Sequence, residues 1–316
     1  MRILIALLIC LLPAAAVAQA FPSKPIRLVL RSPPGGTDDL LGRLIAQKMP
    51  EILGQQVIVD YRTGAGGLVA WEFIAKAPPD GYTILLVASG LGAIKSLRPN
   101  ATVDPWRDFT WISQITNYQL AMVVHPSLPV KTVKDLVALA RARPGQLSYG
   151  SSGLGATPHL SAEYFKSAAK VNILHVPYKG AGPMFIDLMG GRLEMAFSVV
   201  ASSIPHAKSG KLRILGVTGA KRVPQLRDVP TIGESVPGYE FTAFYALIGP
   251  AKMPRDVLDR LAEATAKVIA SPEVRERIVN AGMEAVSSTP EQMLQTAKKD
   301  GAKIDNIVRT AGIKLE

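Results

Sequence analysis

The sequence predicts an α/β fold with mostly parallel sheets, flanked by helices and divided between two lobes. Short apolar runs typical of strands alternate with longer stretches in which apolar residues recur every three or four positions, as on one face of a helix. Glycine-rich segments separate many of these runs, as turns between strands and helices require. At 316 residues the chain is longer than one hydrophobic core usually supports, which favours two lobes.

The first part of the chain contains repeated strand-loop-helix units. Residues 26–30 are predicted as a strand, and residues 39–52 as a helix with apolar positions at Leu41, Leu44 and Ile45. Gly54 is suited to end this helix. The units that follow are a strand at 57–59, a helix at 68–76 and a strand at 83–87.

The middle of the chain repeats this pattern. Pro158 is preorganised for the first turn of a helix. Strands that alternate with helices are typical of parallel sheets. The predicted strands are residues 120–124, 146–150, 172–176, 193–199 and 212–217, and the predicted helices are residues 133–142, 159–168 and 183–189.

Four polar, glycine-rich loops follow predicted strands. They are residues 33–38, 64–67, 151–157 and 177–182, two in each half. In open α/β sheets, ligands bind beyond the carboxyl ends of the strands, where such loops lie. Backbone N–H groups at a helix start, together with the positive end of the helix dipole, favour an anion. The sequence therefore predicts an anion-binding cleft between two lobes, although each loop alone is also explained as a tight turn.

The N-terminal segment, residues 1–20, is predicted to be a signal peptide. Arg2 supplies a positive charge, residues 3–12 form an apolar run too short to span a bilayer, and Ala18-Gln19-Ala20 is a small-residue cleavage site. Cleavage near Ala20 would leave the mature protein in the periplasm. It would also remove Cys10, the only cysteine, which excludes disulfides and thiol catalysis in the mature chain.

Charge and histidine patterns narrow the classes of function. The 36 basic and 25 acidic residues give a net charge of +11, but the basic residues are dispersed, so we predict no nucleic-acid partner. The four histidines show no paired spacing, so we expect no metal site, and no motif predicts another cofactor.

An enzyme is the alternative from a different class. Ser152 lies in a glycine-flanked segment and His159 follows it, so a secreted serine hydrolase acting on small esters is the second hypothesis. The nucleophile-elbow motif needs glycine where Leu154 stands, and no third, orienting group is implied. We therefore favour loop hydrogen bonding and helix capping for both residues, and expect no enzymatic activity.

An ordered series of short motifs covers the chain from about Phe21 to the C-terminus. With this series the chain resembles the Bug-type periplasmic solute-binding receptors of tripartite tricarboxylate transporters. Each motif alone is weak, but their order is specific. The motifs are residues 21–27, 34–38, 64–67, 79–83, 104–105 with 108–109, 151–155 with His159, 175–180, 230–231 with Glu234, 237–239 and 249–251.

The resemblance implies a type II-like periplasmic binding protein, in which two α/β lobes joined by two crossover strands close on a solute. The crossings would be residues 120–124 and 241–247. Lobe 1 would comprise residues 21–120 and 225–316, and lobe 2 residues 121–224. Such a receptor delivers its solute to membrane transporter subunits through a transient contact. A receptor that feeds a signalling sensor is a further alternative.

The resemblance also implies a solute held by backbone N–H groups and hydroxyls rather than by an arginine clamp. The solute would be a small organic anion, meaning a mono-, di- or tricarboxylate or an acidic amino acid. The residues carried over to this site are Ser32, Pro34, Gly35, Gly36, Thr37, Asp38, Ala65, Gly66, Gly67, Ser89, Ser151, Ser152, Gly153, Thr157, His159, Tyr178, Lys179, Gly180 and Ser198.

The chain departs from the family pattern just before the first loop. Arg31-Ser32 stands where family members usually have a proline and an aromatic residue. We expect Arg31 either to pair with a second carboxylate of the solute or to lie at the surface beside Asp38 or Asp39. The class of solute depends on which of these holds.

Overall fold

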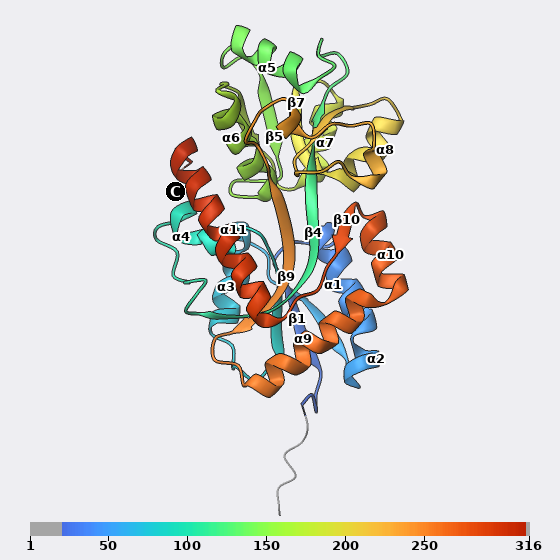
Figure 1. The fold of residues 1–316 in the computed structure, drawn as a ribbon. Helices are drawn as coiled ribbons and strands as arrows, with labels where there is room; N and C mark the ends of the chain where they lie inside the picture. Colours follow the sequence, from blue (N-terminus) through green and yellow to red (C-terminus); the bar gives the residue numbers. More distant parts are fainter. Residues whose placement is uncertain (1–20, 314–316) are drawn as a thin grey trace, which may run out of the picture.

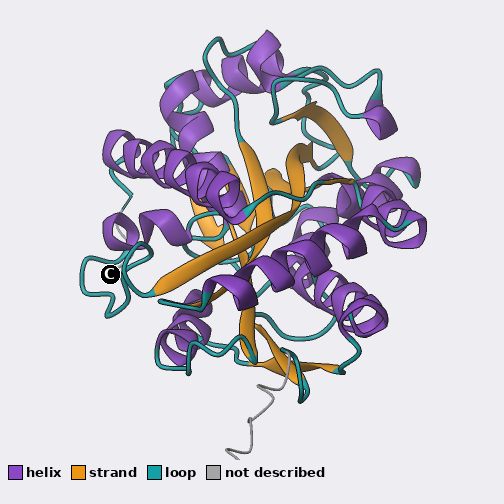
Figure 2. Cartoon of the chain, turned by 60° about the horizontal axis from the view of Figure 1, so that its bottom comes forward, coloured by secondary structure: helices purple, strands orange, loops and turns teal. Residues whose placement is uncertain are grey.

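The structure is a computed structural model that describes residues 21–313, and it has an α/β fold with one mixed sheet (Figure 1). The predicted signal peptide, residues 1–20, lies outside the described residues. The strands occupy the interior, and helices surround them (Figure 2). The α/β fold class predicted from the sequence is confirmed.

The elements follow one another largely as the sequence predicts. The first group is β1 (Ile26–Leu30), α1 (Thr37–Lys48), α2 (Pro50–Leu53), β2 (Val57–Tyr61), α3 (Leu68–Ala75), β3 (Thr83–Ala88) and α4 (Ile94–Leu97). The second is β4 (Phe109–Val124), α5 (Val133–Ala142), β5 (Ser148–Ser151), α6 (Thr157–Ala169), β6 (Leu174–Pro177), α7 (Ala181–Met189), β7 (Met195–Val199), α8 (Val200–Lys208) and β8 (Arg213–Val217). The last is β9 (Thr242–Pro250), α9 (Arg255–Ala270), α10 (Pro272–Asn280), β10 (Met283–Ala285) and α11 (Pro290–Ala311).

The helix predicted over residues 39–52 is divided in two. α1 ends at Lys48, and α2 begins with Pro50 at its first position. Proline lacks a backbone N–H and so cannot continue the hydrogen-bond ladder of α1, and the division falls where the chain reaches Pro50, although Met49 itself keeps helical dihedral angles. Gly54 ends α2 with a φ of 74°, the left-handed conformation that glycine adopts without strain.

Two long strands join the parallel strands into one sheet. The strand order is β2-β1-β3-β9-β4-β7-β5-β6, with β8 and β10 also paired to β4. β1 is parallel to β2 and β3, and β5 is parallel to β6 and β7. The pairs that involve β4 or β9 are antiparallel. Parallel pairing is therefore confirmed within each group of strands, and the antiparallel pairs belong to the crossover strands.

Helices gather at the two ends of β4 and β9 (Figure 1). α1 to α3, α9 and α10 lie around one end, and α5 to α8 lie around the other. β9 returns the chain to the first end, which is why α9 packs against α1 and α2. α11 contacts both α4 and α6, so it bridges the two ends. This arrangement agrees with two lobes, and the boundaries at residues 120 and 225 remain a prediction.

Candidate functional site

The register of the long strands places the carboxyl ends of both groups of strands near the middle of the sheet. β3 runs in the same direction as β4, and its last residue, Ala88, lies opposite Tyr245, which lies opposite Thr116 of β4. β7 runs the other way, and its last residue, Val199, lies opposite Leu120. These ends are four residues apart along β4, about 13 Å at roughly 3.3 Å per residue. Loops from both halves of the chain therefore meet in one region.

The first loop leaves open space before the backbone of α1. Gly36 precedes the helix, and no described side chain caps the helix start with a hydrogen bond. A Cβ added at Gly36 would meet no described atom within 4 Å. The neighbouring Gly35 N–H is engaged, because it donates to Asp39 Oδ2 at 2.9 Å. Pro34, Gly35 and Gly36 are exposed. The start of α1 is therefore accessible to an anion.

The second loop is built from residues in the left-handed conformation. Ala65, Gly66 and Gly67 have φ values of 46°, 67° and 104°. α3 begins directly after them, without a side-chain cap among the described residues. A Cβ at Gly67 would lie 3.2 Å from Cδ of Arg31 and 3.2 Å from the ring of Trp71. Glycine at this position therefore lets Arg31 lie against the loop.

Arg31 forms an ion pair with Asp38 at the start of α1. Its Nε lies 3.3 Å from Asp38 Oδ2, and Ser32 Oγ donates to the same oxygen at 2.9 Å. The side chain of Arg31 is 21% exposed and that of Asp38 is 6% exposed. Arg31 lies beside Asp38, as the second expectation has it, but its side chain is largely buried rather than at the surface, and pairing with a carboxylate of the solute stays a prediction. Arg31 and Asp38 are seven positions apart in the sequence, but only residues 31–36 connect β1 to α1, and this short connection brings the two side chains together.

Two tyrosines of the long strands lie beside this ion pair. The rings of Tyr118 in β4 and Tyr245 in β9 stack at 5.2 Å between centroids. The Tyr118 hydroxyl donates to Thr157 Oγ1 at 3.2 Å, which joins β4 to the third loop. Burial raises the pKa of Tyr118 to about 12, and burial with the nearby charge of Asp38 raises the pKa of Tyr245. Sequence reasoning missed both tyrosines, because an aromatic residue in an apolar strand has the same pattern as a core residue.

Three stacked rings support the third loop. Tyr149 stacks on His175 at 4.7 Å, and His175 stacks on His159 at 4.2 Å. His159 Nδ1 accepts the N–H of Gly155 at 3.1 Å, and His175 Nε2 lies 2.7 Å from Ser151 Oγ. Burial lowers the pKa of His159 to about 4 and the pKa of His175 to about 3. Both rings are therefore neutral near pH 7, and His159 holds the loop as expected.

The geometry does not join Ser152 to His159. Ser152 instead uses its carbonyl oxygen to accept the N–H of Gly180 at 3.2 Å. In the third loop, the serine that contacts a histidine is Ser151, which is fully buried, and no carboxylate of residues 21–313 hydrogen-bonds His175. Nucleophilic catalysis needs an accessible nucleophile and an oriented base. The hydrolase hypothesis therefore gains no support from these side chains.

The fourth loop lies beside the third because β5 and β6 are parallel neighbours. The N–H of Tyr178 donates to the carbonyl oxygen of Ser151 at 3.0 Å. Gly180, with φ of 108°, precedes α7, and no described side chain caps this helix. The Tyr178 hydroxyl donates to Asp187 Oδ2 at 2.7 Å, and Lys179 is exposed. The N–H groups of Tyr178 and Gly180 are both engaged within the third and fourth loops, so the uncapped start of α7 after Gly180 is the part left for a ligand.

Two further predicted contacts are buried serines. Ser89 follows β3, and its Oγ accepts the N–H of Phe244 at 2.9 Å. Ser198 lies in β7 and is 3% exposed. The next residue after Ser89, Gly90, donates its N–H to Asp300 of α11 at 3.1 Å. Burial raises the pKa of Asp300 to about 6. α11 thus holds the turn that carries Ser89.

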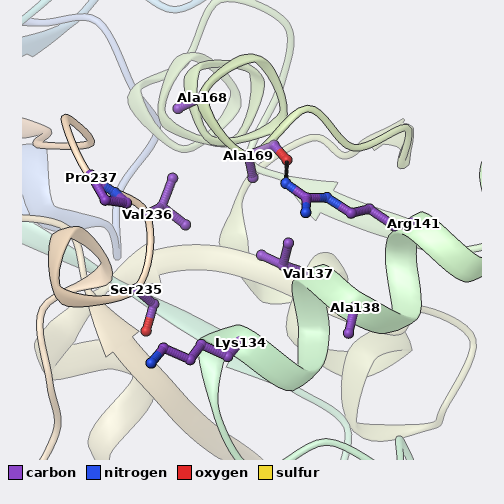
Figure 3. A pocket seen from close by; sticks show the side chains of 9 residues that line it. All are labelled: Lys134, Val137, Ala138, Arg141, Ala168, Ala169, Ser235, Val236 and Pro237. Atoms are coloured by element: carbon purple, nitrogen blue, oxygen red, sulfur yellow. Dashed lines mark hydrogen bonds between the residues drawn. The ribbon is translucent and has the colours of Figure 1, made fainter.

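A surface hollow of about 370 Å³ lies away from these loops (Figure 3). It is lined by α5, the end of α6 and residues 235–237, and Arg141 Nη2 donates to the carbonyl oxygen of Ala169 at 2.8 Å beside it. None of the predicted contact residues lines this hollow. It is therefore a separate feature from the candidate site.

Within residues 21–313, no three His, Cys, Asp or Glu side chains group closely enough to hold a metal ion. None of the helices in this part of the chain combines the length and the apolar character that crossing a membrane requires.

Comparisons with known proteins extend the resemblance seen in the motifs. Residues 41–313 match the family described as "Tripartite tricarboxylate transporter family receptor". A UPF0065 protein in the tcbD-tcbE intergenic region of Pseudomonas sp. strain P51 is 35% identical over 312 residues, covering 97% of this chain and 93% of that protein.

Two solved structures share the fold along their whole length. R. palustris Rpa4515 with adipate is 37% identical with a TM-score of 0.87, covering 93% of this chain and 100% of the other. MatC (Rpa3494) from Rhodopseudomonas palustris with bound malate is 26% identical with a TM-score of 0.82, covering 91% of this chain and 100% of the other. The chain belongs to the tripartite tricarboxylate transporter receptor family.

Proposed function

We propose that this protein is an extracytoplasmic receptor that binds one small carboxylate-bearing organic anion between its two lobes. The receptor acts in the periplasm after cleavage near Ala20 and hands the solute to membrane transporter subunits. The proposed lobes are residues 21–120 with 225–316, and residues 121–224. No catalytic step is part of this function.

One observation carries the proposal: four helices begin at the facing loops, and no described side chain caps any of them. They are α1, α3, α6 and α7. Thr132 of α5 and Thr289 of α11 form capping boxes, whereas α2, α4, α8, α9 and α10 also lack a side-chain cap from the described residues. The distinguishing feature is therefore that α1, α3, α6 and α7 begin at loops which meet in one region. Free N–H groups and the positive ends of helix dipoles favour an anion without any catalytic group.

The expected affinity follows from these N–H groups. A charge-assisted hydrogen bond contributes about 1.5 to 3 kcal/mol. Ordering the ligand and closing the lobes offset part of this gain. Several such bonds then remain consistent with a Kd of about 1 µM or lower, which is a binding free energy of about 8 kcal/mol. The similar structures with adipate and with malate support a carboxylate as the ligand class.

A thermal-shift screen tests the proposal on the chain from Phe21 onward, after co-purified solute has been removed by unfolding and refolding. The screen contains mono-, di- and tricarboxylates and acidic amino acids. A ligand at 100 times its Kd stabilises the folded state by about 2.7 kcal/mol, which raises Tm by roughly 5 °C in a protein of this size. The absence of a shift with every carboxylate would contradict the proposal.

Simple ester substrates serve as the control for the enzyme hypothesis. We expect no turnover of p-nitrophenyl acetate above that of the Ser151→Ala and Ser152→Ala variants. Turnover that the Ser151→Ala substitution abolishes would instead indicate a hydrolase. Turnover that Ser152→Ala abolishes would likewise indicate a hydrolase.

A further inference from the structure

We propose that Asp38 makes this receptor prefer a ligand with one carboxylate, because it neutralises Arg31 and leaves no compensation for a second negative charge. This inference rests on the proposed function and specifies its ligand class. Family resemblance does not predict it, since the residues before the first loop depart from the family pattern.

The ion pair lies where the two halves of the molecule meet. Asp38 is the second residue of α1, next to the free backbone at Gly36. Arg31 lies against Gly67 of the second loop, and both charges are close enough to influence Tyr118 and Tyr245. Since Tyr118 donates to Thr157 of the third loop, the pair belongs to one network that reaches three of the four loops.

Both charged side chains are largely removed from water. The exposed fraction is 6% for Asp38 and 21% for Arg31. Charges in such a place are screened weakly, so the sign of a ligand group nearby matters strongly. Arg31 Nε is buried and has no hydrogen-bond partner within residues 21–313, because its 3.3 Å contact with Asp38 is not aligned as a hydrogen bond.

The pair as a whole has almost no net charge. A second carboxylate of the ligand placed beside it would be attracted by Arg31 and repelled by Asp38, so the repulsion offsets part of the attraction. The carboxylate would still lose its hydration, and this cost would remain uncompensated. An uncharged far end of the ligand does not carry this cost, so a monocarboxylate is favoured over the matched dicarboxylate.

Removal of the negative charge should shift the preference toward the dicarboxylate. Asp38→Asn keeps the shape of the side chain and its contact with Ser32, but leaves Arg31 as an uncompensated cation. Arg31→Gln has the opposite effect, since Asp38 then stands alone and repels a second carboxylate. The double variant removes both charges and should return the preference close to that of the natural protein.

The test is titration calorimetry with matched pairs of four, five and six carbons: butyrate and succinate, pentanoate and glutarate, hexanoate and adipate. The natural protein is expected to bind the monocarboxylate of the preferred length about tenfold more tightly than the dicarboxylate. Asp38→Asn is expected to shift this ratio by about tenfold or more toward the dicarboxylate. Asp80→Asn is the matched control, because Asp80 pairs with Lys24 ahead of the first residue of β3, at the opposite end of that strand.

The outcomes separate this inference from the proposed function. Tighter binding of a dicarboxylate by the natural protein, or a ratio that Asp38→Asn leaves unchanged, would overturn the inference while the receptor function stands. Binding of tricarboxylates alone would overturn it in the same way. Failure of every carboxylate to bind would overturn both.

Discussion

Gly36 is the position at which one added side chain tests the candidate site most cleanly. Its φ of −98° and ψ of −174° are accessible to any residue, and an added Cβ would meet no described atom within 4 Å. Valine should therefore be accommodated, with a change in the free energy of unfolding of about 1 kcal/mol or less. Gly153 is a less suitable position, because its φ of 138° would strain any other residue.

The effect on binding follows from the space that valine fills. Its methyl groups would stand before the first N–H groups of α1, which we propose the ligand carboxylate approaches. Each hydrogen bond lost to a charged acceptor costs about 1.5 to 3 kcal/mol, so one lost bond weakens binding about 10- to 150-fold. Gly36→Ala adds a single carbon and should have a smaller effect of the same sign.

Titration calorimetry of the natural protein and both variants measures the effect, and thermal unfolding without ligand is the control for folding. We expect Tm within about 3 °C of the natural protein and at least tenfold weaker binding for Gly36→Val. A folded Gly36→Val variant with an unchanged Kd would remove the start of α1 from the site.

Three further expectations concern stability and pH. Tyr118→Phe and Thr157→Val should each lower the free energy of unfolding, measured in urea, by about 1 kcal/mol. The double variant should lower it by less than the sum of the two single effects, because both substitutions remove the same hydrogen bond. Strict additivity would show that the two hydroxyls are not coupled. Burial raises the pKa of Asp300 to about 6, so the folded protein favours the protonated carboxyl. The contribution of Asp300 to the free energy of unfolding is therefore fully present below pH 4 and is lost as the pH rises through 6. Asp300→Asn should therefore stabilise the protein at pH 7, by at most about 3 kcal/mol since the side chain keeps some solvent access, and should have little effect at pH 4. The lowered pKa values of His159 and His175 act in the opposite direction, because protonation of either ring favours the unfolded state. In the Asp300→Asn background, the free energy of unfolding should therefore be highest above pH 6.5 and fall toward pH 4. A free energy of unfolding in urea that does not change with pH would contradict the burial of both rings.

The local structure could be predicted where the periodicity is strong. Residues 26–30 and 133–142 are predicted with the bounds that β1 and α5 have, because a pure apolar run and a clean helical repeat leave little ambiguity. β4 was predicted only over 120–124, while the strand begins at Phe109. Its first part carries polar residues among the apolar ones, so it lacks an apolar pattern.

The site was predicted in its loops but not in its side-chain network. Glycines at loop positions can be read from the sequence, since only glycine suits several of these conformations. The pairing of Arg31 with Asp38 depends on how sharply β1 turns into α1, and the contact of Ser151 with His175 depends on the register of β5 and β6. Tyr118 joins the network only because β4 and α6 meet in three dimensions. Such tertiary contacts have no signal in local periodicity.

The most direct test of the receptor function is calorimetric titration of the ligand-free chain from Phe21 onward with each carboxylate that shifts its Tm. The account predicts a one-to-one complex with at least one of them, with a Kd of about 1 µM or lower, and binding at least tenfold weaker in Gly36→Val. A protein that is folded but binds no carboxylate below about 1 mM would contradict it.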